Sequence, residues 1–392
     1  MNWKAIQLIT RAGINKIGNM LYDYGNSVWL ASLGKLGETV LGVYQLSDLL
    51  TSLFFNPIGG VISDRFSRRK ILITTDIVCA ILCLGVSFLR EQRLLITGLI
   101  VANIVQAIAF AFSRPANKSY ITEIVAKEDI VTYNSHLEMV LKVISVSSPI
   151  FSFIVLHYAT LQVTLLVDAA TFLLAALLVF FLPNHEPETT SSRLTVKSVL
   201  EDIRAGLTYI RGQGEIFLLL LLASAVNFFF AAFNYLLPFV DRLYQQAGSY
   251  ATILTMGALG SILGAIFAKK WTDSMKDLSL MLAMTGVGVC LMALPILSLK
   301  LVPLSFLGNL ICEFFMTVFN IHFFSQVQTK VEKEYLGRVF STIFTLAILF
   351  MPIATFLMTV LPSIHLASFF IIGLGVIGLS IWYYLYHPLK TK

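Results

Sequence analysis

Apolar residues occur along the whole chain in long blocks that short polar connections separate. Segments of 18 or more mainly apolar residues are candidate membrane helices, because about 20 residues at a rise of 1.5 Å per residue cross the hydrocarbon layer. The pattern predicts twelve spans, at residues 14–33, 38–60, 71–89, 94–113, 133–157, 161–182, 214–240, 249–268, 278–298, 301–325, 336–360 and 363–386. We therefore expect an all-α membrane protein.

The connection between the sixth and seventh spans is much longer than the others. It begins PNHEPETTSS, which is typical of a loop, and continues VKSVLEDIRAGLTYIR, in which apolar residues recur at helical spacing. That spacing predicts an amphipathic helix at the membrane surface. We expect an N-terminal six-helix bundle at residues 1–182, a cytoplasmic linker with this helix at 183–213, and a C-terminal six-helix bundle at 214–392.

The composition supports a membrane protein. Of the 392 residues, 57% are hydrophobic and 13% are charged, whereas soluble domains carry roughly 25% charged residues. The four cysteines lie inside apolar runs without the spacing of zinc ligands, so no metal and no cofactor is expected.

Lysine and arginine predict the orientation. With the N-terminus inside, 22 of the 28 Lys and Arg fall in predicted cytoplasmic segments, three of them around residues 114–127, and five fall in outer loops. This bias predicts that both termini are cytoplasmic. It also accounts for the net charge of +6 without a nucleic-acid partner.

A dense group of charges separates the second and third spans. The stretch reads GGVISDRFSRRKILI, and the stretch LGAIFAKKWTDSMKD follows the eighth span at an offset of 204 residues. Gly60 then pairs with Gly264, whereas Asp64 meets Ala268. Together with the six-plus-six topology, this similarity predicts a duplicated bundle.

This loop carries the pattern G-x-x-x-D-R-x-x-R-[RK], formed by Gly60, Asp64, Arg65, Arg68 and Arg69. Over nearly its whole length the chain resembles the major facilitator superfamily. The resemblance implies two pseudo-symmetric six-helix bundles that work by alternating access. It also implies a gating loop, whose charges pair with neighbouring helix ends when the cytoplasmic side is closed. We expect Gly60 to permit a tight turn between the spans. A plain topology signal, the alternative, would not require Gly60 and Asp64 at these offsets.

Three further stretches narrow the resemblance. FSRPANKSYITEIVAKEDIVTYNS, VLEDIRAGLTYI and EYLGRVFS are similar to the bacterial macrolide-efflux and siderophore-export group, and the first is also similar to lysophospholipid transporters. The antiport patterns of the family are altered: Asn103-Ile-Val-Gln106-Ala107 lacks the arginine of span 4, and Ser148 and Ser152 replace two glycines of span 5. The resemblance implies a monomeric, proton-coupled exporter of amphipathic or cationic, macrolide-like compounds in the bacterial cytoplasmic membrane.

Ionisable residues inside predicted spans are candidate functional groups, because charge at membrane depth is costly. Asp23, Asp48, Lys142 and Glu313 fall near the middle of their spans. In the family, spans 1 and 10 line the central cavity, so we expect Asp23 and Glu313 there, with Asp48 beside them. Protonation and a cationic substrate would compete for such a carboxylate. Lys142 is a candidate for substrate contact.

Other polar residues have weaker assignments. Glu138 and Lys142 are spaced i, i+4, so either an ion pair or substrate contact is open for them. Asp168 lies on a scaffold helix, where a structural role is favoured over a functional one. His322, near the inner end of span 10, is a further candidate for the substrate cavity.

Two spans are rich in phenylalanine. NFFFAAFNYLLPF and EFFMTVFNIHFF place Asn227, Asn234 and Tyr235 among aromatic rings. Apolar walls with a few polar anchors suit a large amphipathic molecule. We expect these three residues to line a substrate cavity.

Motifs of other functional classes are absent from the sequence. It contains no GxxxxGK[ST] loop for ATP-driven transport and neither HExxH nor GxSxG, so the chain is not expected to be an enzyme. Two alternatives stay open. One is transport of a lysophospholipid, another lipid or a siderophore, with Lys142 on the phosphate of a lysolipid. The other is a non-transporting membrane receptor or assembly factor.

Overall fold

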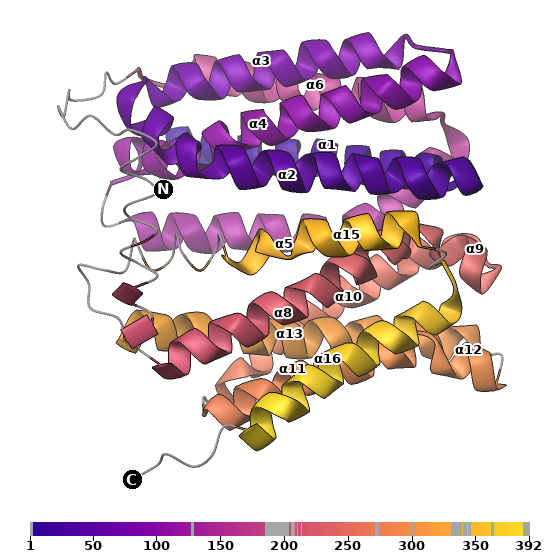
Figure 1. Ribbon diagram of the computed structural model, residues 1–392. Helices are drawn as coiled ribbons and strands as arrows, with labels where there is room; N and C mark the ends of the chain where they lie inside the picture. Colours follow the sequence, from indigo (N-terminus) through magenta and orange to yellow (C-terminus); the bar gives the residue numbers. More distant parts are fainter. Residues whose placement is uncertain are drawn as a thin grey trace. The chain divides into compact units, whose positions relative to one another are not determined.

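The computed structural model describes residues 3–126, 129–184, 204, 208–209, 211–212, 214–270, 274–299, 301–330, 339, 343, 346–361 and 364–386. Every regular element in these ranges is helical (Figure 1). The chain divides into two compact units, Met1–Val199 and Leu200–Lys392. The predicted all-α membrane architecture is confirmed.

The first unit is a bundle of long helices. They are α1 (Trp3–Ala31), α2 (Lys35–Arg65), α3 (Arg68–Ser87), α4 (Gln92–Ile124), α5 (Ile130–Tyr158) and α6 (Leu161–Phe180). Helix α1 packs against α5 and α6, α3 against α4 and α6, and α2 against α4. Helix α1 thus provides most of the contact between α5 and the rest of this bundle.

The second unit contains more breaks. Its elements are α8 (Gly214–Leu236), η2 (Leu237–Phe239), α9 (Val240–Tyr244), α10 (Ser249–Phe267), η3 (Ala268–Lys270), α11 (Met275–Leu291), α12 (Leu294–Leu299), α13 (Val302–Lys330), α15 (Met351–Val360) and α16 (Leu366–Tyr386). Helix α13 packs against α10 and α11, and α16 packs against α11 and α8.

Membrane-spanning character differs among the helices. In the described part of the chain, nine helices are long and apolar enough to cross a membrane, and Leu346–Val360 is a shorter apolar helix. Helices α1 and α2, of 29 and 31 residues, are long enough to cross a membrane but fall outside these nine. In α1 the cause is a series of charged and amide side chains along the helix. These polar side chains make α1 less apolar than the helices of the first unit that are among the nine.

The structure corrects several predicted boundaries. Helix α4 runs on to Ile124, so Arg114 lies inside a helix and not in the polar connection where the sequence placed it. Helix α1 begins at Trp3, so Arg11 is helical too. Residues 185–203 lie outside the described residues, so the surface helix of the linker stays a prediction. The domain boundaries and the orientation of the termini stay predictions as well.

One glycine brings α2 against α4. A Cβ atom on Gly59 would overlap the carbonyl oxygen of Ala111. Pro115 lies one turn further along α4 and has no N–H to bond that carbonyl, so the two helices approach where the oxygen is free. Gly60 does not open a turn as predicted, because α2 stays helical through Arg65 and the chain turns at Phe66 and Ser67.

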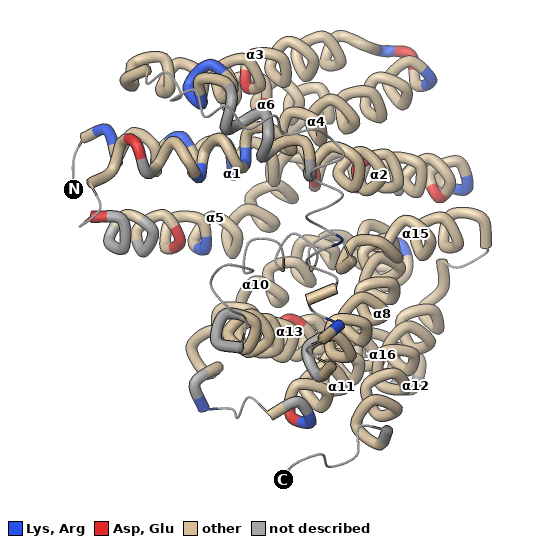
Figure 2. The backbone as a smooth tube through the Cα atoms, turned by 60° about the vertical axis from the view of Figure 1, so that its left-hand side comes forward, with Lys and Arg blue, Asp and Glu red and all other residues tan. Residues whose placement is uncertain are grey.

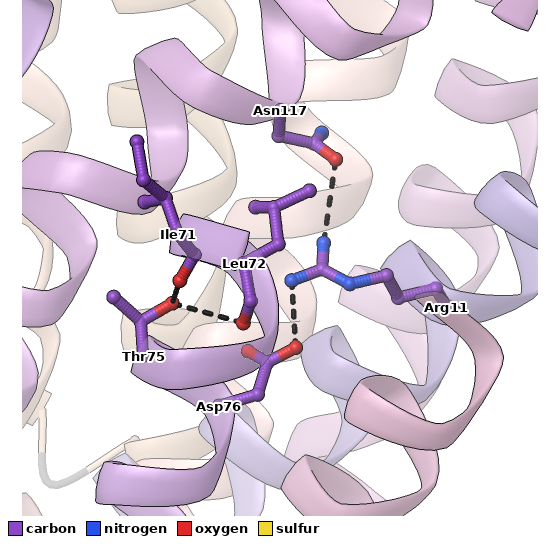
Figure 3. A network of polar contacts seen from close by, with 6 residues as sticks. All are labelled: Arg11, Ile71, Leu72, Thr75, Asp76 and Asn117. Atoms are coloured by element: carbon purple, nitrogen blue, oxygen red, sulfur yellow. Dashed lines mark hydrogen bonds and ion pairs between the residues drawn. The ribbon is translucent and has the colours of Figure 1, made fainter. Parts of the chain in front are cut away.

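A buried ion pair ties three helices of the first unit together (Figure 3). Arg11 of α1 donates from Nη2 to Oδ2 of Asp76 on α3 at 2.8 Å, and from Nη1 to Oδ1 of Asn117 on α4 at 3.3 Å. The side chains of Arg11 and Asp76 are only 6% and 5% exposed. Pairing and hydrogen bonding are what make two buried charges tolerable.

Replacing Asp76 by alanine should unfold the protein at a much lower temperature. The buried Arg11 would lose its counter-ion, which costs about 3–5 kcal/mol of unfolding free energy. Thermal unfolding in detergent measures the loss. The double variant Arg11→Met/Asp76→Leu should recover most of the stability, because two apolar side chains replace the pair. Equal instability of the single and double variants would contradict this account.

Gly59→Ala should also destabilise the bundle, by about 1–3 kcal/mol or more, because the added methyl group overlaps backbone that cannot move independently. Gly85→Ala is the matched control: Gly85 is helical too, and a Cβ there meets nothing within 4 Å. It should be neutral or stabilise by up to about 1 kcal/mol. Melting temperatures of the two variants in one detergent test the difference, and equal shifts would refute the close approach.

Candidate functional site

Charged residues of the first unit meet on α1, α2 and α4. The charges of Asp48 on α2, Lys16 on α1 and Arg114 on α4 all act on Asp23 of α1, and Arg114 also acts on Asp48. Asp23 is exposed, although its neighbours Tyr22 and Tyr24 are buried. In Figure 2 the acidic (red) and basic (blue) positions are few, and most of the tube is tan. The structure thus places the predicted Asp23 and Asp48 within electrostatic reach of each other.

Arg114 supplies positive charge on α4. Its guanidinium lies 5.4 Å from the ring centroid of Phe110, one turn earlier in the same helix, which is cation–π geometry. At the family's arginine position in this helix, Asn103 instead donates to the carbonyl of Tyr44 at 2.8 Å and to Oγ of Ser47 at 3.2 Å. The amide is therefore engaged in tying α4 to α2.

A second polar cluster lies deeper in the first unit. Asp168 of α6 is fully buried and accepts from Nε2 of Gln106 at 3.4 Å and from the thiol of Cys83 at 3.5 Å. Gln106 also donates to Sγ of Cys83 at 3.1 Å. These contacts join α3, α4 and α6, so Asp168 sits among helices and not at a surface.

The second unit contains a neutral aromatic cavity of about 250 Å³. Its walls come from α8, α11, α13 and residues 343 and 347. They are Leu220, Ala223, Val226, Asn227, Leu282, Met316, Phe319, Asn320, Phe323, Phe324, Ile343 and Ala347. The rings of Phe319 and Phe323 stack with centroids 5.7 Å apart. None of these lining residues is ionisable, so the cavity suits an apolar group with amide anchors beside it.

The structure places the predicted polar residues of the second unit at different locations. Asn227 lines this cavity and donates to the carbonyl of Ala347 at 3.0 Å. Asn234 is exposed, and Tyr235 is buried with its ring 5.7 Å from that of Phe239. Neither of these two lines the cavity.

Two further residues predicted as functional candidates, Glu313 and His322, lie on α13 beside α10 and η3. Glu313 on α13 is half-buried, and a Cβ on Gly257 of α10 would lie 3.1 Å from its Cγ. His322 donates from Nε2 to the carbonyl of Ala268 at 2.9 Å. The imidazole therefore holds η3 against α13, and its ring is engaged with backbone.

On α5, Glu138 and Lys142 are both exposed. No ion pair joins these two side chains in the described structure, where the ion pairs are Arg11–Asp76 and Arg68–Glu123. The interpretation of a local ion pair is not supported, and the Lys142 side chain is exposed.

Arg68 and Arg69 are the gating-loop residues whose side chains are described, and they bind the C-terminal ends of α4 and α6. Arg68 forms an ion pair with Glu123 near the end of α4. Arg69 donates to the carbonyls of Val179 and Phe180, and its guanidinium lies 5.3 Å from the Phe180 ring centroid. Cations are favourable at a helix C-terminus, so Arg69 caps α6. The side chains of Gly60, Asp64 and Arg65 lie outside the described residues.

The same region holds the first residues after α6. Oγ of Ser67 donates to Oδ1 of Asn184 at 2.6 Å, and the hydroxyl of Tyr120 donates to the carbonyl of Pro183 at 2.6 Å. The turn between α2 and α3 is thus fixed to the point where the chain leaves the first unit.

Four functional candidates of the first unit were not predicted from the sequence: Arg11, Asp76, Arg114 and Glu123. Asp76 had a usable signal, because it lies in an apolar run like Asp48 does. Arg11 and Arg114 were counted among the cytoplasmic cations, and Glu123 falls in the predicted connection after the fourth span. Only the true lengths of α1 and α4 place these three residues in helices.

Comparisons with known proteins agree with this architecture. The family model described as "Major Facilitator Superfamily" matches residues 17–347. The chain is 23% identical over 330 residues to macrolide efflux protein A of Enterococcus faecalis, covering 81% of this chain and 99% of the relative. It is 24% identical to macrolide efflux protein A of Streptococcus pyogenes, covering 81% and 79%.

Solved transporters share the fold. The nucleoside transporter NupG superposes with a TM-score of 0.73 at 12% identity, covering 97% of this chain and 98% of that one. A bacterial homologue of the iron transporter ferroportin, in its inward-facing state, also has a TM-score of 0.73 at 12% identity, with 98% of both chains covered. The chain is a multi-pass membrane transporter, not an enzyme, and it belongs to the major facilitator superfamily.

Proposed function

We propose that the protein is a proton-coupled exporter of amphipathic, cationic compounds of the macrolide type. The observation that carries this proposal is the cluster of Asp23 and Asp48 with Lys16 and Arg114 on α1, α2 and α4. The similarity to macrolide efflux proteins supports the substrate class. Alternating access, cytoplasmic termini, a monomeric state and a bacterial cytoplasmic membrane belong to the same proposal.

The cluster has the chemistry that exchange of a proton for a cation requires. Two neighbouring carboxylates repel each other, and one bound proton relieves that repulsion. A cationic substrate relieves it as well, so substrate and proton compete for Asp23. Arg114 and Lys16 limit the negative charge that remains when neither is bound. If the substrate binds to Asp23 from the cytoplasmic side and the proton binds to it from the outer side, each cycle exchanges a substrate molecule for a proton.

The neutral cavity of the second unit fits the apolar part of such a substrate. Drug-sized ligands occupy sites of about 300–1,000 Å³, and this cavity of about 250 Å³ is smaller. At this volume the cavity, taken by itself, accommodates a hydrophobic group packed against Phe319 and Phe323. Asn227 and Asn320 provide uncharged hydrogen-bonding groups at its wall.

A second candidate is transport of a lysophospholipid. The observation that favours it is Lys142, which is exposed on α5 without an ion-pair partner in the described structure. An ammonium group of this kind can bind a phosphate as a point charge. Competition for the purified protein between a lysolipid and a macrolide separates the two candidates, because only a shared site gives mutual displacement.

Asp23→Asn and Asp48→Asn should each reduce proton-driven efflux at least about tenfold, because the variants cannot exchange a proton at that position. The measurement is uptake of a radiolabelled macrolide into inverted vesicles under an imposed pH gradient. Glu91→Gln, at an exposed residue between α3 and α4, is the matched carboxyl-to-amide control and should transport normally. Glu313→Gln tests the predicted carboxyl of the second unit in the same assay. Wild-type efflux by Asp23→Asn would remove this residue from the mechanism.

Ala223→Leu should weaken binding of the same macrolide by about tenfold, because the larger side chain fills part of the aromatic cavity. Ala265→Leu enlarges an exposed residue of α10 in the same unit by the same amount and is the control. Equilibrium binding to the purified proteins tests this, with melting temperatures to show that both variants are folded. Unchanged affinity in folded Ala223→Leu would place the substrate elsewhere.

A further inference from the structure

The first residues after α6 are bound to the first unit by side chains of α4 and of the α2–α3 turn. Leu182 is 3% exposed and belongs to the same core cluster as Tyr120. The hydroxyl of Tyr120, near the end of α4, donates to the carbonyl of Pro183 at 2.6 Å. Oδ1 of Asn184 accepts from Oγ of Ser67 at 2.6 Å. The connection to the second unit therefore stays bound to the first unit as far as Asn184.

Three consecutive residues where α3 begins contact the ends of other helices. Ser67, which joins α2 to α3, bonds to Asn184. Arg68 forms an ion pair with Glu123 in the last turn of α4. Arg69 donates to the carbonyls of the last two residues of α6. Two of these three contacts thus end on α6 or on the residues that directly follow it.

The hydroxyl of Ser67 connects Asn184 to the first turn of α3. It donates to Asn184 and, as the N-cap of α3, accepts from the backbone N–H of Lys70 at 3.3 Å. The carbonyl of Ser67 also accepts from the N–H of Ile71 at 3.0 Å. A serine hydroxyl has a single proton to donate, and Asn184 takes it. Because Ser67 is only 6% exposed, these bonds form where the side chain has little access to solvent.

The turn between α2 and α3 is too short to bend independently of the helices. Helix α2 ends at Arg65 and α3 begins at Arg68, so only Phe66 and Ser67 separate them. Rigid helices carry a displacement from one end to the other. This turn belongs to the gating loop, whose charges pair and separate as the family switches between states. A displacement of the loop therefore acts on the residues after α6 through side chains that already touch them.

We propose that the α2–α3 turn and residues 179–184 form one coupled element, which passes a displacement of the gating loop to the connection between the two units. Ser67 and Tyr120 are positioning residues in this element, because each fixes one residue of that connection. Coupling of this kind is reciprocal, so loosening the chain after α6 also loosens the first turn of α3. The proposal rests on the gating loop and not on the proposed substrate or on proton coupling.

Tyr120→Phe tests the coupling without any substrate, because it removes the bond to Pro183 and keeps the buried ring. Loss of one such hydrogen bond should make the amides of Lys70 and Ile71 exchange with deuterium about three to ten times faster. The Tyr120 hydroxyl bonds to neither amide. Tyr158→Phe, at a tyrosine that is 85% exposed, is the matched control and should exchange like the wild type. Unchanged exchange of the two amides in folded Tyr120→Phe would overturn the coupling.

The double variant Ser67→Cys/Asn184→Cys tests the role of the contact in transport. The four native cysteines are buried, so a short, reversible bifunctional thiol reagent joins the introduced pair. Without the reagent, uptake of a radiolabelled macrolide into inverted vesicles should fall at least about threefold, because the hydrogen bond is lost, while affinity stays within about twofold. Joining the two thiols should restore uptake, and reducing the link should slow it again.

Wild-type uptake by the unlinked double variant, or arrest of uptake on linking, would contradict the proposal. The first result would show that the contact transmits nothing, and the second that it has to open during transport. A wild-type protein that moves no macrolide would instead remove the proposed function. The exchange of the Lys70 and Ile71 amides, which requires no substrate, would then decide the coupling by itself.

Discussion

The cost of placing charge among packed helices organises the first unit. Arg11 and Asp76 are tolerated because each supplies the other's counter-ion, with Asn117 satisfying a second guanidinium N–H (Figure 3). This pair connects α1 to α3 and α4. The remaining buried acid, Asp168, has no such partner in the described structure and must be accommodated by neutral hydrogen bonds. The two buried acids of this bundle are thus accommodated in different ways, one by a counter-ion and the other by neutral donors.

Helix α1 carries buried residues on one side and the exposed Asp23 on another, because one side of the helix packs against its neighbours and the other does not. Its buried side supplies Arg11, Gly18 and Tyr22, while Asp23 is exposed. A one-residue step along a helix turns the side chain by about 100°, so Tyr22 and Asp23 are adjacent in sequence but face different surroundings. This arrangement explains why α1 fails the composition of a membrane span although it is long enough. Polarity that would be costly in contact with lipid is placed against other helices or on an open face.

The sequence predicted the number and order of the helices well, because hydrophobic length is a local property. It did not predict which charged side chains form ion pairs, because such pairs join residues that are far apart in the sequence. Arg11 and Asp76 are 65 residues apart. Charge counting assigned Arg11 and Arg114 to polar segments, since the helices extend beyond their apolar parts. The motif directed attention to Gly60, whereas Gly59 makes the close approach to Ala111. That contact depends on the rotation of α2 and on Pro115, neither of which periodicity reveals.

The chemistry of the two units, each taken by itself, differs in a way that bears on specificity. The first unit concentrates carboxylates and cations, whose interactions are directional and depend on charge. The cavity of the second unit is lined by aromatic, aliphatic and amide side chains and contains no ionisable group among the residues that line it. Aromatic walls discriminate weakly between apolar shapes, and adding or removing one methylene changes binding by only about 1–3 kcal/mol. Charge selection in the first unit combined with permissive packing in the second would give a transporter that is strict about the charge of its substrate and tolerant of its shape.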